Sequence, residues 1–131
     1  MANEIKVSGG LQYANGASQF NASPSSFRAD QAVKKGPTPG AITVTTGGVT
    51  ISLAELTTPG ISHFVNTDPT NYVQYGLYIS STFYPFGELK PGEAYPLRLA
   101  RDLLTANGGA AVLQFKANTG SCLCMVNILN D

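Results

Sequence analysis

The side chains that could carry out nucleophilic or acid–base chemistry in this sequence are few and widely separated. The single imidazole is His63, in the segment ISHFV, and the two thiols are Cys122 and Cys124. A nucleophilic site needs a base within hydrogen-bond reach of the nucleophile, and no spacing here indicates such a pair. We therefore predict that His63 is a structural or surface residue and that the protein is not an enzyme.

A pair of carboxylates, Glu88 and Glu93, flanks the stretch LKPG. Two carboxylates held roughly 5–10 Å apart can hydrolyse a glycosidic bond. Pro91-Gly92 fits the central positions of a type II turn, since proline fixes φ and glycine accepts a positive φ. We therefore predict that both glutamates are solvated charges beside a hairpin turn, with a hydrolase kept as an alternative.

The sequence lacks the residue spacings that bind metal ions or phosphate. It has no His-x-His, no Cys-x-x-Cys, no calcium loop and no glycine-rich loop followed by Lys-Ser or Lys-Thr. In a strand, Cys122 and Cys124 would point to one face roughly 6.5–7 Å apart, too far for an easy mutual disulfide. We predict no metal, no cofactor and two buried thiols; an intersubunit disulfide or a redox pair is the alternative.

The composition is that of a neutral globular chain. Of 131 residues, 43% are apolar and only 12% are charged, and eight Lys and Arg balance eight Asp and Glu. The basic pairs Lys34-Lys35 and Arg98 with Arg101 are too few to neutralise a phosphate backbone. We expect no nucleic-acid partner, and the weak self-repulsion is compatible with permanent subunit packing.

No membrane segment is predicted. The N-terminal MANEIKV has no basic stretch followed by an apolar core. No apolar run approaches the roughly 18 residues that span a bilayer. We expect no membrane association and synthesis in a cytoplasm.

Residues 41–131 show the alternation that is typical of half-buried β-strands. Apolar and polar residues alternate on both sides of Gly47-Gly48, in AITVTT and VTISLAEL, which predicts a β-hairpin. In YVQYGLYIS, residues 73, 75, 77 and 79 are predicted to face a core. The C-terminal SCLCMVNIL is apolar at most positions, which is typical of a central strand covered on both sides.

Turn signals separate about eight such runs, and only residues 100–109 could form a helical turn. The predicted fold class is therefore all-β, an antiparallel β-sandwich or a jelly-roll-like barrel of about eight short strands with an extended N-terminal arm.

Residues 1–40 are predicted to form this arm and residues 41–131 the sandwich. The arm has few large aliphatic residues, a tight-turn signal at Asn15-Gly16, and three prolines, at 24, 37 and 39, that interrupt ladder pairing. Such a segment cannot form its own core. We expect it to extend over the main body or to pack on a neighbouring subunit.

Seven of the chain's twelve aromatic residues lie between positions 71 and 99. Aromatic side chains can form a protein interface or stack on sugar rings, whereas single-stranded nucleic acid would also need a basic groove. We favour a core plus a subunit interface over a glycan platform. The candidate interface residues are Ile5, Val7, Phe20, Phe27, Tyr72, Tyr78, Phe83, Tyr84 and Phe86.

Residues 56–100 also carry a family likeness, in VNTDPTNYVQYG, then an aromatic-proline segment, then LKPGEAYPLRLA. This pattern of strand, turn and strand, about a third of the chain, resembles small β-sandwich proteins among the virion structural proteins of tailed bacteriophages. The resemblance implies a virion component made in the host bacterial cytoplasm, such as a capsid decoration (cement) protein working as a homo-oligomer. It implies no individual functional residues.

We therefore expect a non-enzymatic virion structural protein that binds capsid or other virion proteins as a small cyclic homo-oligomer, with a trimer favoured. Its arm would lie across a neighbour or the shell and add strand pairing. The alternative is a tail-associated or receptor- or carbohydrate-binding β-sandwich module.

Overall fold

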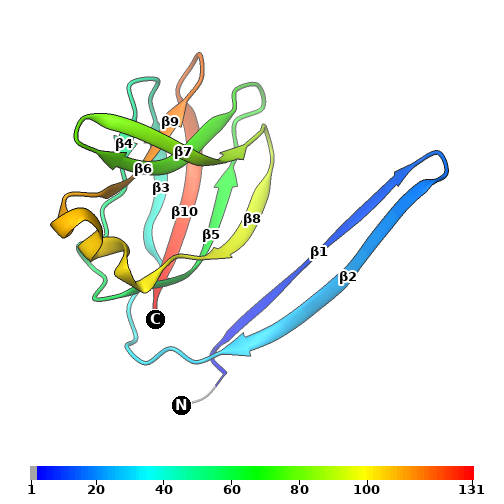
Figure 1. The fold of residues 1–131 in the computed structure, drawn as a ribbon, viewed down its shortest axis with the longest axis horizontal. Helices are drawn as coiled ribbons and strands as arrows, with labels where there is room; N and C mark the ends of the chain where they lie inside the picture. The colour runs from blue at the N-terminus through cyan, green and yellow to red at the C-terminus, as the bar shows by residue number, and fades with distance from the viewer. Residues whose placement is uncertain (1–2) are drawn as a thin grey trace. The chain divides into compact units, whose positions relative to one another are not determined.

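The computed structural model describes residues 3–131 and shows an all-β protein (Figure 1). The chain divides between Ala32 and Val33 into two compact units. The first unit is a β-hairpin, and the second contains eight strands and one 3₁₀-helix, η1 (Arg101–Gly109). The all-β prediction is confirmed.

The first unit consists of β1 (Ile5–Asn15) and β2 (Ser18–Ala29), which pair antiparallel with one register shift between Gly9 and Leu11. Asn15 pairs with Ser18, so Gly16 and Ala17 form a two-residue loop. Gly16 has a φ of 59°, and a positive φ at the first loop position is the reason that such hairpin turns favour glycine there. The turn predicted at this point is confirmed.

The second unit is a sandwich of two four-stranded antiparallel sheets. The first sheet has the order β3-β10-β5-β8 and the second the order β4-β9-β6-β7. The strands are β3 (Thr38–Val44), β4 (Val49–Thr50), β5 (Pro59–Asn66), β6 (Val73–Ile79), β7 (Thr82–Leu89), β8 (Ala94–Arg98), β9 (Val112–Ala117) and β10 (Cys122–Asn130).

Nearly every connection in the sandwich carries the chain from one sheet to the other; only β6 and β7 are consecutive strands of one sheet. This order is that of an eight-stranded double-sheet jelly roll. The prediction of a β-sandwich of about eight strands is confirmed.

The core lies between the two sheets and is centred on aromatic rings. Phe64 of β5 meets Tyr75 of β6 and Phe115 of β9 edge-on, with ring centroids 5.2 and 5.0 Å apart. Val73, Leu89 and the inward residues of β10 are fully buried around them. The predicted inward side of β6 is confirmed at Val73 and Tyr75, while residues 77 and 79 are half-buried.

The predicted β-hairpin across Gly47-Gly48 is wrong. The turn exists, since the Gly48 N–H donates to the Thr45 carbonyl. However, β3 pairs with β10 and β4 pairs with β9, so this turn carries the chain from one sheet to the other. Two alternating runs that face each other across a core have the same sequence pattern as two that pair side by side, and the pattern could not distinguish them.

The predicted boundary at residue 40 differs from the observed one because β3 already begins at Thr38 and belongs to the sandwich. Pro39 is tolerated there since β3 is an edge strand. Pro24, which was expected to interrupt ladder pairing, lies within β2. Pro24 falls where β2 has two residues between paired positions and β1 has one, a β-bulge that accommodates proline.

Candidate interaction surfaces

The structure does not bring His63 and the two cysteines together. His63 points outward from β5 and is exposed, whereas Cys122 and Cys124 point from β10 into the core and are fully buried. Among residues 3–131, no group of three or more His, Cys, Asp or Glu side chains could hold a metal ion.

Both cysteines are free thiols. Burial raises the pKa of Cys124 to about 12, with smaller contributions from Cys122 and Asp68, and burial likewise raises the pKa of Cys122. A thiol that stays protonated at neutral pH is a poor nucleophile and a poor metal ligand. The prediction of buried thiols is confirmed, and an intersubunit disulfide is incompatible with their burial in this fold.

The two glutamates of the 88–93 stretch have separate structural partners. The Gln74 amide donates to Glu88 over 3.3 Å on the outside of the sheet. The Glu93 carboxylate accepts the Lys90 backbone N–H at 2.9 Å and so closes the turn. The arrangement supports the interpretation of Glu93 as a turn residue.

The basic residues Arg98 and Arg101 are both paired with one carboxylate. Their guanidinium groups lie 2.7 and 3.1 Å from the two oxygens of Asp131. The hydrogen bond from Arg98 is the main cause that lowers the pKa of Asp131. The single carboxylate of Asp131 therefore offsets part of the positive charge of these two arginines and holds them at one site.

Asn66 is a fully buried polar residue that the sequence patterns did not single out. Its side-chain amide donates to the carbonyls of Asn71 and Leu89 at 2.8 and 3.1 Å. Its side-chain oxygen accepts the Asp68 N–H at 3.0 Å, and its backbone carbonyl accepts the Gly92 N–H. Asn66 thus joins the turn NTDPTN to the turn LKPG, the segments that carry the family likeness.

The hairpin of β1 and β2 is amphipathic. Residues paired across an antiparallel ladder share a face, and Val7 pairs with Phe27, Leu11 with Ala22, and Tyr13 with Phe20. The extra residue of the bulge changes the alternation of β2, and this change places Phe20 and Phe27 on the same face. We call this side the hairpin face; its residues are Ile5, Val7, Leu11, Tyr13, Phe20, Ala22, Phe27 and Ala29.

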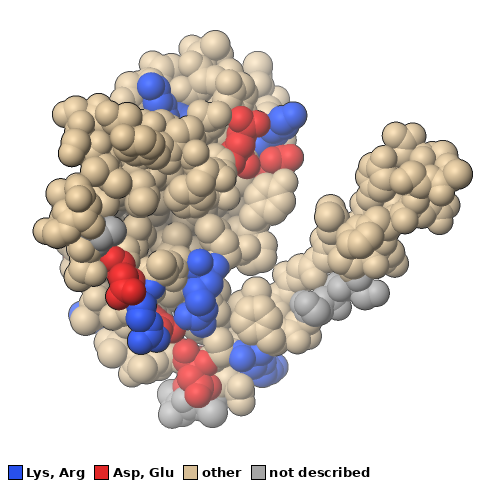
Figure 2. Space-filling view, in the orientation of Figure 1, with Lys and Arg blue, Asp and Glu red and all other residues tan. Residues whose placement is uncertain are grey.

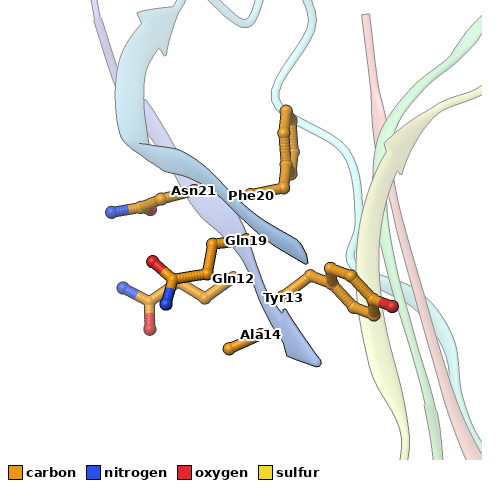
Figure 3. A pocket seen from close by; sticks show the side chains of 6 residues that line it. All are labelled: Gln12, Tyr13, Ala14, Gln19, Phe20 and Asn21. Carbon is orange, nitrogen blue, oxygen red and sulfur yellow. The ribbon is translucent and has the colours of Figure 1, made fainter. Parts of the chain in front are cut away.

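The opposite side of the hairpin is polar. Gln12 pairs with Asn21, and Gln19 with Ala14. These residues line a hollow at the hairpin end together with Tyr13 and Phe20. Figure 3 shows the rings of Tyr13 and Phe20 on one side of the ribbon and Gln12, Gln19 and Asn21 on the other.

The hairpin face is exposed and uncharged. Tyr13, Phe20 and Phe27 are each about half exposed, at 49%, 56% and 54%, and Leu11 is 62% exposed. From Val7 to Phe27 the sequence has no Asp, Glu, Lys or Arg. In Figure 2 the charged side chains of this unit accordingly lie only at its base. An apolar, charge-free surface of this kind is typical of an interaction site.

A second uncharged surface covers the outside of the sheet β3-β10-β5-β8. Ala41, Met125, Val65 and Ala94 form one row across the four strands. Pro39, Asn127, His63 and Pro96 form the next row, and Thr43 pairs with Leu123 beyond the first. We call these ten residues the sheet face; none is Asp, Glu, Lys or Arg.

The expectation that β10 is covered on both sides is wrong within a single chain. Its inward residues are fully buried, but on the sheet face Leu123 is 52% exposed and Met125 is only half-buried. The apolar character of β10 on both sides therefore exceeds what the sandwich itself requires.

The outside of the other sheet is more polar. Lys116, Gln74 and Glu88 form a row across β9, β6 and β7. Two rows farther along the strands, the predicted interface residues Tyr78 and Phe83 pair with each other and are half-buried. The two outer faces of the sandwich thus differ in charge.

The candidate interface residues do not form one cluster. Ile5, Val7, Phe20 and Phe27 belong to the hairpin face, whereas the other five lie on or beside β6 and β7. Phe86 sits in the bulge of β7 and meets Tyr75 edge-on, and Tyr72 and Tyr84 are exposed. Leu11 and Tyr13 were missed, although the alternation of Ile5, Val7, Leu11 and Tyr13 in β1 could have indicated them. Leu123 and Met125 were assigned to a covered strand.

The sandwich also holds a pocket of roughly 350 Å³ between the β4 region and η1. Its lining is almost wholly apolar, from Ile51, Leu53, Leu103, Leu104 and Leu113 among others, and no titratable side chain lines it. The lining includes the hydroxyls of Thr50 and Ser52 but no titratable side chain that could activate them as a base. Among the described residues, no helix is both long and apolar enough to cross a membrane.

Comparison with known proteins yields no relative from which a function could be transferred. No family model matches the chain, and neither the curated proteins nor the solved structures contain a match. The resemblance to phage virion sandwiches therefore stays a prediction based on the residues quoted for it.

Proposed function

We propose that this chain is a non-enzymatic structural protein of a virion, a capsid decoration or cement protein that binds the phage shell as a homo-oligomer. The observation that carries the proposal is the hairpin face, which is apolar, uncharged and exposed. The proposal places the protein on the particle, where binding at many equivalent points would stabilise the shell by mass action.

The hairpin has a physical need for a partner. An isolated two-stranded hairpin is at best marginally stable in water, because one ladder cannot bury enough apolar surface. Covering the side chains of Leu11, Tyr13, Phe20 and Phe27, each about half exposed or more, would remove that deficit. Extended segments that add strands or side chains to a neighbour are a common mode of protein recognition.

The jelly roll adds limited support. Double-sheet jelly rolls are frequent in viral capsid and lectin domains, but one fold hosts many functions. The fold agrees with the family likeness of residues 56–100, and the hairpin face supplies an exposed apolar surface through which such a protein would assemble into the homo-oligomer that binds the shell. A trimer is the favoured assembly, since decoration proteins that seal joints between shell subunits must match the local symmetry of the lattice.

A truncation tests the proposal. Residues 1–32 would be removed and residues 33–131 kept, because the Asn130 N–H donates to the Lys35 carbonyl and this contact belongs to the sandwich. The truncated chain should remain folded by circular dichroism. It should no longer bind capsids of the virus that encodes it, while the full chain binds in a parallel sedimentation assay. A truncated protein that decorates capsids at full occupancy would overturn the role of the hairpin.

A receptor- or carbohydrate-binding module remains a second candidate, because Tyr84, Phe86 and Tyr95 on the sandwich are exposed. Exposed aromatic rings can stack on sugars. The Glu93 carboxylate is hydrogen-bonded to Tyr95, and burial together with this carboxylate raises the pKa of Tyr95. A glycan array with the full chain tests this candidate: binding that is lost in Phe86→Ala and Tyr95→Ala would support it, and no binding across the array would reject it.

A further inference from the structure

We propose that the sheet face is the docking surface for the hairpin face of a second copy of this chain. The inference deepens the homo-oligomer of the proposed function and rests on that part of it. It holds whether the assembled protein sits on a capsid or elsewhere.

The sheet face has the composition of a covered surface. Strands buried on both sides are apolar at nearly every position, whereas a strand with one solvated side alternates. The sequence of β10 is that of a strand buried on both sides, yet its residue Leu123 is 52% exposed in the single chain. The neighbouring positions Ala41, Val65 and Ala94 are also small or apolar. A partner that covers this face would account for the pattern.

The two faces match in charge. Neither contains Asp, Glu, Lys or Arg, so bringing them together leaves no charge buried without a partner, which would otherwise oppose association strongly. Charges occur at the margins instead, with Lys6 and Arg28 on the polar side of the hairpin base and the Arg98–Asp131 pair at one end of the sheet face. An apolar centre with a charged margin is the usual anatomy of a protein interface.

The hairpin face is long enough to form a stable interface. With β1 at 11 residues, the hairpin is about 37 Å long and about 10 Å wide, which gives a footprint of about 350 Å². Reciprocal exchange of two hairpins between two copies would bury about 1,400 Å² in total, within the range of stable interfaces. Each copy has one hairpin face and one sheet face. A closed ring in which every copy donates its hairpin to one neighbour and accepts a hairpin from the other is therefore also compatible with these faces.

The short connection between the two units favours exchange of the hairpin between two copies of the chain. The contact between Asn130 and Lys35 fixes the start of the sandwich, and the hairpin ends at Ala29. Only residues 30–34 join the two, and short hinge segments favour exchange of an element between copies over folding back within one chain.

Solution mass tests the inference directly. The wild-type chain should exceed the 13.7 kDa of one copy in light scattering. Leu123→Glu on the sheet face and Phe20→Glu on the hairpin face should each raise the dissociation constant by roughly a hundredfold, because each buries an unpaired charge. Both side chains are exposed in the single chain, so circular dichroism should show both variants folded.

Two matched variants serve as controls. Gln19→Glu places the same charge on the polar side of the hairpin, and Thr50→Glu places it on the other sheet; both should keep the wild-type mass. A wild-type chain that is monomeric, or controls that dissociate as readily as the face variants, would overturn the inference.

Cross-linking identifies the occupant. Phe20→Cys and Leu123→Cys would be prepared as separate chains and treated with a short bismaleimide, with the parent chain as control because its own cysteines are buried. Covalent dimers should form when the two variants are mixed. A double variant that instead links within one chain at high dilution would show that the hairpin covers its own sheet, and no link in either case would show that a different partner covers the face.

The outcomes separate the two proposals. An oligomer that fails to bind capsids would remove the decoration role and leave the inference standing. A monomer that binds capsids would do the reverse.

Discussion

The hairpin of residues 3–32 and the sandwich of residues 33–131 are built from the same antiparallel ladders, but only the sandwich buries the side chains that its ladders align. In the sandwich, Phe64 and Phe115 are fully buried, while in the hairpin Phe20 and Phe27 remain more than half exposed. Pairing of strands satisfies the backbone in both units, whereas burial of apolar area provides most of the stability. The aligned side chains of the hairpin therefore contribute little burial to the stability of the single chain.

The largest effect that separates the two units is expected from removing a core ring. Phe115→Ala should lower the free energy of unfolding by about 3–5 kcal/mol, since a buried ring leaves a cavity; Phe115 contacts Phe64 and stacks on Tyr75 with centroids 5.4 Å apart. Phe20→Ala in the hairpin should change it by less than about 0.5 kcal/mol. Urea unfolding at a dilution that suppresses association measures both, and equal losses would contradict the comparison.

The next effect concerns the buried amide that joins two turns. Asn66→Ala should lower the free energy of unfolding by about 2–4 kcal/mol. The carbonyls of Asn71 and Leu89 and the Asp68 N–H would each lose a hydrogen-bond partner in the interior. Asn21→Ala on the polar side of the hairpin is the matched control and should be nearly neutral. A similar small change at both positions in thermal unfolding would show that Asn66 does not hold the turns together.

A smaller effect is expected from crowding the aromatic cluster. A Cβ at Gly87 would lie 2.1 Å from the Tyr75 ring. Gly87→Ala should therefore displace this ring and lower the free energy of unfolding by about 1–3 kcal/mol. At Gly47 the nearest atom to a new Cβ is 4.0 Å away, and Gly47→Ala should be tolerated. Near-ultraviolet circular dichroism should change only for the Gly87 variant; an unchanged tyrosine signal there would argue against the observed packing.

The last effect is absent at neutral pH and appears only as a loss of sandwich stability at alkaline pH. The pKa of Cys124 is raised from 9.0 to about 12 by burial, so the folded state holds a proton that the unfolded state releases. The stabilisation that comes from burying the protonated Cys124 thiol is fully present below pH 9, and it is lost as the pH rises toward about 12. Cys124→Ala should reduce this slope in unfolding measured across that range. A slope identical to that of the wild type would contradict the assignment.

Much of the fold could be predicted from the sequence because alternation is a local property. Val73 and Tyr75 were placed inward, the turn near Gly16 was located, and about eight sandwich strands were expected, all from neighbours within a few positions. The hairpin across Gly47-Gly48 was predicted wrongly because pairing with β10 and β9 involves residues distant in the sequence. The bulge at Pro24 could not be predicted for the same reason, because a bulge is defined by how the residues of β2 pair with those of β1.

By itself, the sequence determined the β-class of the chain, its neutrality and the uncharged run from Val7 to Phe27, because these depend only on residue types and local order. Tertiary structure alone decided that Phe20 and Phe27 share a face, that Asn66 joins two turns, and that the outside of β10 is left uncovered. Each of these depends on which distant strands pair and in which register, and no local pattern encodes that choice.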